Sequence, residues 1–211
     1  GAIDLGGVKT AGSAVSMSAS GTSGTITVRE IRTTPVTGNG GNITLTSGST
    51  MTLGASPTPP APPPAPAFAG HIDASPGGGV AGNVTLNAGG AISVISGNGI
   101  TANELKMTAV GGITSTTGQL GIQAATVNAL NSGTGSLQLS HTGPNPITVG
   151  DIGTVGYGLK NLAPGEQVSL SAPNGLVTVA AGINTNAGEI RLNADKMAIN
   201  APLSTGSNTS G

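Results

Sequence analysis

Apolar and polar residues alternate at every second position along much of this chain. In residues 82–94, Val84 and Leu86 alternate with polar residues. Gly89-Gly90 follows them, and a second alternating segment begins at Ile92. Period-two alternation predicts a strand with one buried face, and paired glycines between two such segments predict a turn. The unit therefore predicts two short strands joined at a corner.

The same unit recurs throughout the sequence. Further alternating copies lie at Val15–Ala19, Ile43–Ser47, Leu105–Ala109, Leu137–His141, Val168–Ala172 and Ile190–Ala194. Neighbouring copies such as those at Val84 and Leu105 are about 20–22 residues apart, and other intervals are longer. A repeat of this length indicates stacked structural units, each burying its apolar face against its neighbours.

The repeat length and the strand pattern together predict the fold class. A strand advances about 3.3 Å per residue, so one repeat holds two or three short strands and their corners. The leucine and asparagine consensus of leucine-rich repeats is missing, and no segment has the 3.6-residue period of a helix. We expect one all-β domain over residues 1–211, a right-handed parallel β-helix (β-solenoid) with coils of about 20–22 residues.

Two segments interrupt the pattern and are expected to be loop insertions. The first, at about 54–81, contains the proline-rich run Ser56–Pro66. Proline cannot donate to a strand ladder, so this run predicts an excursion from the stack; a proline-rich ligand for another protein is the alternative. The second excursion is expected at about 153–165, and the strand assignment is ambiguous over 105–136.

Composition narrows the choice of function. Only 7% of residues are charged and 1% are aromatic, which indicates a thin aliphatic core. With a net charge of -1 and only seven Lys and Arg, scattered along the chain, there is no basic patch for nucleic acid. No apolar run reaches the ~20 residues of a membrane span, and without cysteine there are neither disulfides nor thiolate metal sites.

Several repeats resemble those of filamentous haemagglutinin-like exoproteins, the secreted adhesins of two-partner secretion in Gram-negative bacteria. The clearest are Gly41–Gly48 and Gly82–Gly90, and Gly135–Ser140 and Gly188–Ala194 match more loosely. The resemblance implies a secreted fibre at the bacterial cell surface, used in adhesion, aggregation, biofilm contacts or toxin delivery. It also implies an outer-membrane secretion partner. The family's secretion domain carries Asn-Pro motifs, and Asn145-Pro146 is the single candidate here, so we interpret the chain as shaft repeats, with a secretion domain as the alternative. Because Gly1–Leu5 is already patterned, we expect no signal peptide and interpret the chain as part of a longer protein.

Carboxylates clustered on one face would indicate a polysaccharide-cleaving β-helix, so we considered every acidic residue. The eight acids are Asp4, Glu30, Asp73, Glu104, Asp151, Glu166, Glu189 and Asp195, almost one per repeat. Glu166 and Glu189 could stack on adjacent coils, and this spacing favours a solvated corner over a catalytic pair. His71 and Asp73 flank Ile72 without a nucleophile, and we expect His141 at an exposed corner. These positions predict no catalytic, cofactor-binding or metal-binding residues.

Asn42 and Asn83 precede two of the repeated strands and are expected to have a structural role. Both begin N-glycosylation strings, as does Asn208, but such strings arise by chance in a chain rich in Asn and Thr. Asparagine tolerates the backbone geometry of turns, and its amide can bridge stacked strands. We therefore expect these two side chains to link neighbouring coils.

The expected function is a non-catalytic structural or adhesive segment of a secreted surface fibre, with end-to-end filament assembly as a variant. Its partners would be other copies, neighbouring cells, or host surface glycans and proteins. The alternative is a carbohydrate-active β-helix enzyme or a phage tail-spike-like glycan-binding domain. Ice binding, a third class, requires a regular threonine array, and pairs such as Thr44 and Thr46 are too irregular along the sequence to favour it.

Overall fold

The computed structural model describes residues 1–54, 72–95 and 99–206, and this part of the chain is entirely β, without a helix. Its strands are β1 Ala2–Leu5, β2 Val8–Lys9, β3 Val15–Ala19, β4 Thr25–Val28, β5 Ile31–Arg32, β6 Ile43–Ser47, β7 Met51–Leu53, β8 Ile72–Asp73, β9 Val84–Ala88, β10 Ile92–Val94, β11 Gly99–Ala109, β12 Ile113–Ser115, β13 Leu120–Asn131, β14 Leu137–His141, β15 Ile147–Val149, β16 Leu159–Pro164, β17 Val168–Val179, β18 Ile183–Asn186, β19 Ile190–Ile199 and β20 Leu203–Ser204. The short alternating units of the sequence are therefore strands, as expected. Three of them, β3, β6 and β14, have the predicted bounds, and β9 lies within the stretch 82–94.

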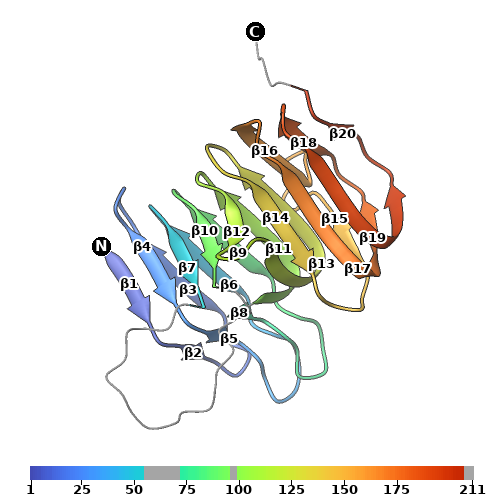
Figure 1. The fold of residues 1–211 in the computed structure, drawn as a ribbon. Coiled ribbons are helices and arrows are strands. Elements are labelled where there is room, and N and C mark those ends of the chain that lie inside the picture. The colour runs from blue at the N-terminus through green and yellow to red at the C-terminus, as the bar shows by residue number, and fades with distance from the viewer. Residues whose placement is uncertain (55–71, 96–98, 207–211) are drawn as a thin grey trace.

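The strands pair in parallel with strands from neighbouring repeats. One series runs β1, β4, β7, β10, β12 and continues through β14, β17 and β19. A second series joins β3, β6, β9, β11 and β13, and β2, β5 and β8 lead into the first half of β11. Figure 1 shows the strands following one another from the blue β1 to the red β19 in chain order.

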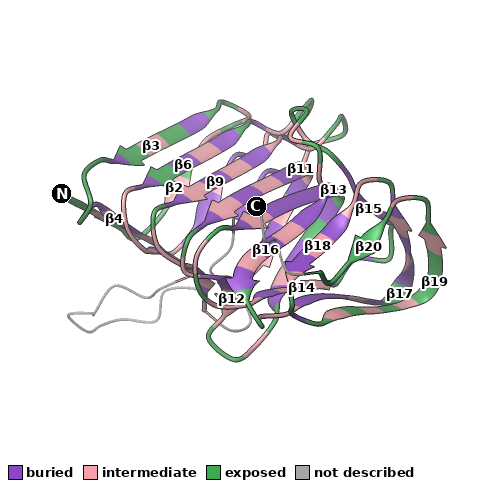
Figure 2. Ribbon diagram, turned by 90° about the horizontal axis from the view of Figure 1, so that it is seen from above, coloured by how far each residue is buried: buried purple, intermediate pink, exposed green. Residues whose placement is uncertain are grey.

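The registers place like residues above one another and so form the core. One column contains Ile31, Ile72, Ile100 and Ile122, each at most 1% exposed. Burying an aliphatic side chain of this size contributes roughly 1.5–3 kcal/mol. The buried bands recur at every second residue along the strands in Figure 2. The core therefore lies between the strand series and contains no aromatic side chain among the described residues.

The first expected insertion is narrower than 54–81 on its C-terminal side. Its proline-rich run and His71 lie outside the described residues. Ile72 and Asp73, however, form β8, which pairs with β5 and with β11. Ile72 is 1% exposed and belongs to the isoleucine column, which explains why this short piece returns to the sheet.

The second expected excursion, at about 153–165, ends earlier than predicted, because residues 159–164 form β16. This strand pairs with β13 and β18, and Leu159 and Ala163 are buried in it. Before it, the Asp151 carboxylate accepts hydrogen bonds from the backbone N–H groups of Val155 and Gly156 at 2.7 and 2.8 Å. The excursion is therefore a compact loop held by its own aspartate.

Candidate binding site

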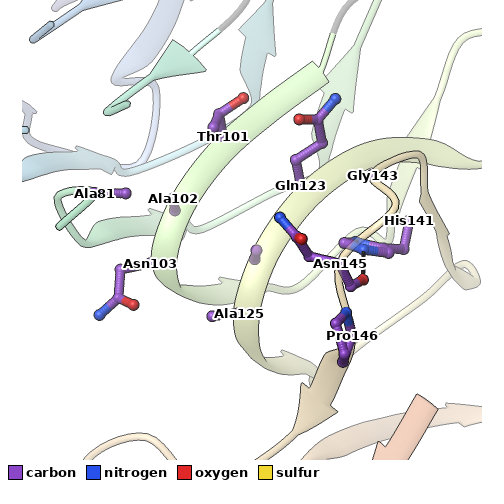
Figure 3. Close-up of a pocket in the computed structure, with 11 residues that line it drawn as sticks. Ala81, Thr101, Ala102, Asn103, Gln123, Ala125, His141, Gly143, Asn145 and Pro146 are labelled. Carbon is purple, nitrogen blue, oxygen red and sulfur yellow. Dashed lines mark hydrogen bonds between the residues drawn. The ribbon is translucent and has the colours of Figure 1, made fainter. Parts of the chain in front are cut away.

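A hollow of about 220 Å³ opens where four segments of the chain meet. Ala81 comes from the segment before β9, residues 101–103 from β11, and residues 123–125 from β13. The fourth wall runs from His141, the last residue of β14, to Pro146. Figure 3 shows Thr101 and Asn103 on one bent strand, Gln123 and Ala125 on the next, and His141 and Asn145 beside them.

The bends in β11 and β13 create the recess. Thr101 pairs with Gln123 in the ladder, and the next pairs are Ala102 with Ala124 and Glu104 with Thr126. Asn103, which the ladder skips, instead donates its backbone N–H to Gly82 O at 2.9 Å. Each long strand thus turns from one series to the other at this point, and the corner leaves space beside it.

His141 anchors the fourth wall from inside the protein. It follows Ile122 in the isoleucine column and is only 3% exposed, so the expectation of an exposed corner is wrong. Its Nε2 lies 2.8 Å from Asn145 O, and because a carbonyl accepts, Nε2 carries the hydrogen. Nδ1 is buried without a hydrogen-bond partner among the described residues.

The sequence pattern itself predicts a buried position for His141. Leu137 and Leu139 point inward, and period two places residue 141 on the same face. Room for the ring comes from glycine: a Cβ at Gly143 would lie 3.4 Å from two ring atoms. The ring thus replaces an isoleucine in the column and holds the loop to Pro146 close to the sheet.

The polar groups at the hollow are amides and a hydroxyl, without a charged side chain among the lining residues. Gln123 Nε2 donates to Thr142 Oγ1 at 3.3 Å, and Asn103 Nδ2 donates to Asn83 Oδ1 at 3.4 Å. Gln123 and Asn145 are exposed. The hollow can therefore offer hydrogen-bond donors and acceptors to a ligand, but no counter-charge.

Several of the acidic residues considered for catalysis have structural partners. Glu30, 3% exposed, lies 3.0 Å from Arg32 Nε and 3.9 Å from Lys9 Nζ, and Arg32 also approaches Asp73 at 3.6 Å. In this ladder Lys9, Arg32 and Asp73 are register neighbours. Asp73 thus belongs to an ion-pair cluster between strands.

Glu166 and Glu189 do not form a pair. The register joins Val168 to Ile190, so Gly188 rather than Glu189 lies beside Glu166. Glu166 accepts a hydrogen bond from Ser136 Oγ at 2.6 Å. Glu189 contacts Arg191 Nε at 2.7 Å, and this hydrogen bond lowers the pKa of the exposed Glu189 carboxyl. Each carboxylate therefore has a partner of its own, and the two do not act together.

Asn42 and Asn83 link neighbouring repeats, as their positions predict. Asn42 Oδ1 accepts from the backbone N–H of Asn83 at 2.9 Å. Asn83 repeats the contact one repeat further, where its Oδ1 accepts from Glu104 N at 3.2 Å. Its Nδ2 donates to the Glu104 carboxylate at 2.8 Å. The third glycosylation string, at Asn208, lies outside the described residues.

The described part of the chain has neither a cluster of metal-binding side chains nor a helix that could span a membrane. Within residues 1–54, 72–95 and 99–206, no three His, Cys, Asp or Glu side chains are placed to hold a metal ion. The same residues contain no helix with the length and apolarity needed to cross a bilayer.

Comparison with protein-family models, curated proteins and solved structures found no match to this chain.

Proposed function

We propose that the chain is a right-handed parallel β-helix that forms a structural and adhesive segment of a secreted bacterial surface fibre. One observation carries the proposal: residues of successive repeats stand in parallel register, as Ile31, Ile72, Ile100 and Ile122 do. Stacking of this kind extends along one axis, because each repeat contacts only its neighbours. A long, thin body of this type presents much surface without needing an active site.

The polar interior supports a structural role. Several buried or half-buried polar side chains form hydrogen bonds with groups in neighbouring strands and turns; examples are Asn83, Asn131 and Asn161. The carboxylates Glu30, Asp151 and Glu166 are likewise held by cations, backbone N–H groups or a hydroxyl. These groups hold the repeats together, so we propose that the segment acts by contact rather than by catalysis.

An end-to-end filament is the variant of this proposal that involves other copies of the chain. Val179 and Ile183 are fully buried, whereas Ile199 and Leu203, their register partners in β19 and β20, are 51% and 41% exposed. Strand edges with apolar neighbours are templates for association. A second copy that pairs in parallel with this edge would cover these side chains.

Electron microscopy and adhesion assays test the proposal together. Purified protein should appear as rods of constant width, and beads coated with it should attach to cells more than uncoated beads do. Release of reducing ends from a panel of polysaccharides would contradict the non-catalytic role. Compact round particles would contradict the β-helix. Secretion that depends on a co-expressed outer-membrane transporter would test the secretion partner and the cell-surface location.

A further inference from the structure

We infer that the hollow beside His141 binds a neutral sugar that carries an acetamido group. The inference names a ligand class for the adhesive role proposed above and rests on that role for its biological meaning. The inference is based on the chemistry of the lining, the size of the hollow and the structure of its fourth wall.

The absence of charge from the described lining favours a neutral ligand. The side chains around the hollow are alanines, amides, a threonine, a proline and His141, whose Nε2–H is bonded to Asn145 O. The ion-pair cluster of Lys9, Glu30, Arg32 and Asp73 is not part of the lining. An ionic ligand would lose water here without gaining an opposite charge, which is unfavourable.

Three primary amides surround the hollow, and each has both a donor and an acceptor. Asn103 and Gln123 use only a side-chain N–H in their described hydrogen bonds, at 3.4 and 3.3 Å. Their oxygens can accept from a ligand N–H, while Asn145 can donate to a ligand carbonyl. An acetamido group supplies that N–H and that carbonyl on adjacent atoms.

Small apolar side chains form the remaining surface. Ala102 and Ala124 are buried, 5% and 4% exposed, whereas Ala81 is half-buried and Ala125 is exposed. The methyl of an acetamido group can cover the methyl groups of Ala81 and Ala125. The volume of about 220 Å³ is below the roughly 300–1,000 Å³ of sites for drug-sized ligands. We therefore expect one sugar residue to enter rather than a longer stretch of polymer.

His141 is a positioning residue for this site. By donating to Asn145 O it fixes the backbone from which the Asn145 side chain projects. The ring lies in the wall of the hollow with its Nδ1 unpaired and 97% of the residue withdrawn from solvent, since it is 3% exposed. The ring therefore acts on the site through its hydrogen bond to Asn145 O.

Chemical-shift titration of the intact, isotopically labelled protein tests the inference. The probes are the methyl glycosides of N-acetylglucosamine and of glucose, and free glucuronic acid, each up to about 50 mM, well above millimolar affinities. The acetamido sugar should shift the side-chain amide signals of Gln123 and Asn145 saturably, and the other two should bind about tenfold more weakly. The inference is overturned if the acetamido sugar causes no saturable shift. Equal binding of the glucoside, or tighter binding of the acid, also overturns it.

Two variants and a matched control locate the binding. Gln123→Ala combined with Asn145→Ala removes two exposed amides and should weaken binding at least tenfold. Gln138→Ala removes an amide from β14 outside the hollow and should leave the affinity for the sugar unchanged. Unaltered binding by the double variant would place the sugar elsewhere and overturn the site. Gln123→Glu, which keeps the size of the side chain, is a second test should the double variant not fold.

Electron micrographs of the same samples separate this inference from the proposed function. Rods without sugar binding would overturn the site and leave the fibre intact. Sugar binding by compact particles would keep the site and overturn the fibre.

Discussion

The side-chain amide of Asn131 donates a hydrogen bond to the amide oxygen of Asn161 at 3.0 Å, and both residues are 0% exposed. The two are register partners in β13 and β16. Asn131 Oδ1 also accepts from Gly112 N, and Asn161 Nδ2 donates to Gln167 O, both at 3.0 Å. The two stacked asparagines thus form hydrogen bonds with backbone groups in the turns of neighbouring repeats, from inside the protein.

Replacing Asn161 by alanine should therefore be costly. The substitution leaves the backbone N–H of Ala163 without its partner. Asn131 Nδ2 keeps Thr134 O and Gly135 O, and Gln167 O keeps the Leu137 N–H, so these two groups each lose one of their hydrogen bonds. An unpaired buried polar group costs about 1–3 kcal/mol and a lost hydrogen bond about 1 kcal/mol, so we expect a loss of about 2–4 kcal/mol in the free energy of unfolding, measured in urea. Asn193→Ala is the control, because Asn193 is exposed and should change stability by less than about 0.5 kcal/mol. Equal stability of the two variants would show that the buried pair contributes nothing.

Asn83→Ala should loosen the corner before β9. Asn83 joins the repeat of Asn42 to that of Glu104 through three hydrogen bonds. Two of them use its side chain, which is partly exposed, so we expect a loss of about 0.5–2 kcal/mol and a lower Tm. Glu104→Gln keeps an oxygen that can accept from Asn83 and should cost less. An unchanged Tm for Asn83→Ala would exclude the bridging role.

Gly48→Ala should disrupt a close contact between repeats. A Cβ at Gly48 would lie 1.8 Å from Gly21 O, and backbone cannot move aside as a side chain can. We expect a loss of about 3 kcal/mol, the upper range for overpacking, in chemical denaturation. Gly6→Ala is the matched control, since nothing lies within 4 Å of a Cβ there. If both variants unfold at the same denaturant concentration, the contact is not as tight as the structure indicates.

The pKa of Tyr157 should be higher than the ordinary value of about 10. Burial disfavours the phenolate, and the negative charge of Asp151 adds to the effect. Because the native state holds its proton more tightly than the unfolded chain, stability should fall as the pH rises from about 10 through the native pKa. Tyr157 is the only tyrosine and there is no tryptophan, so ultraviolet absorbance reports this group alone.

Asp151→Asn separates the two causes of this shift. The variant should have a lower pKa at Tyr157 than the parent, but one still above the ordinary value, because burial is the larger cause. A midpoint at the ordinary value in the parent protein would mean that the ring is not buried as it is in the structure.

The strands of this protein could be predicted because the information for them is local. Period-two alternation within five residues predicted β3, β6 and β14 with their bounds, and placed β9 within residues 82–94. The link between Asn42 and Asn83 was also predictable, since each precedes a copy of the same strand. Strand propensity and the repeat length together therefore determined an all-β chain with parallel partners.

Tertiary structure decided the positions where the pattern is weak or where distant segments meet. Ile72 and β16 looked like parts of insertions, but stacking on neighbouring strands buries Ile72 and Leu159 and so draws them into the sheet. The hollow forms from four segments, and His141 closes it by entering a column that isoleucine fills elsewhere. Alternation states which face of a strand is apolar, whereas register and the volume left by neighbours such as Gly143 decide which side chain fills a given space.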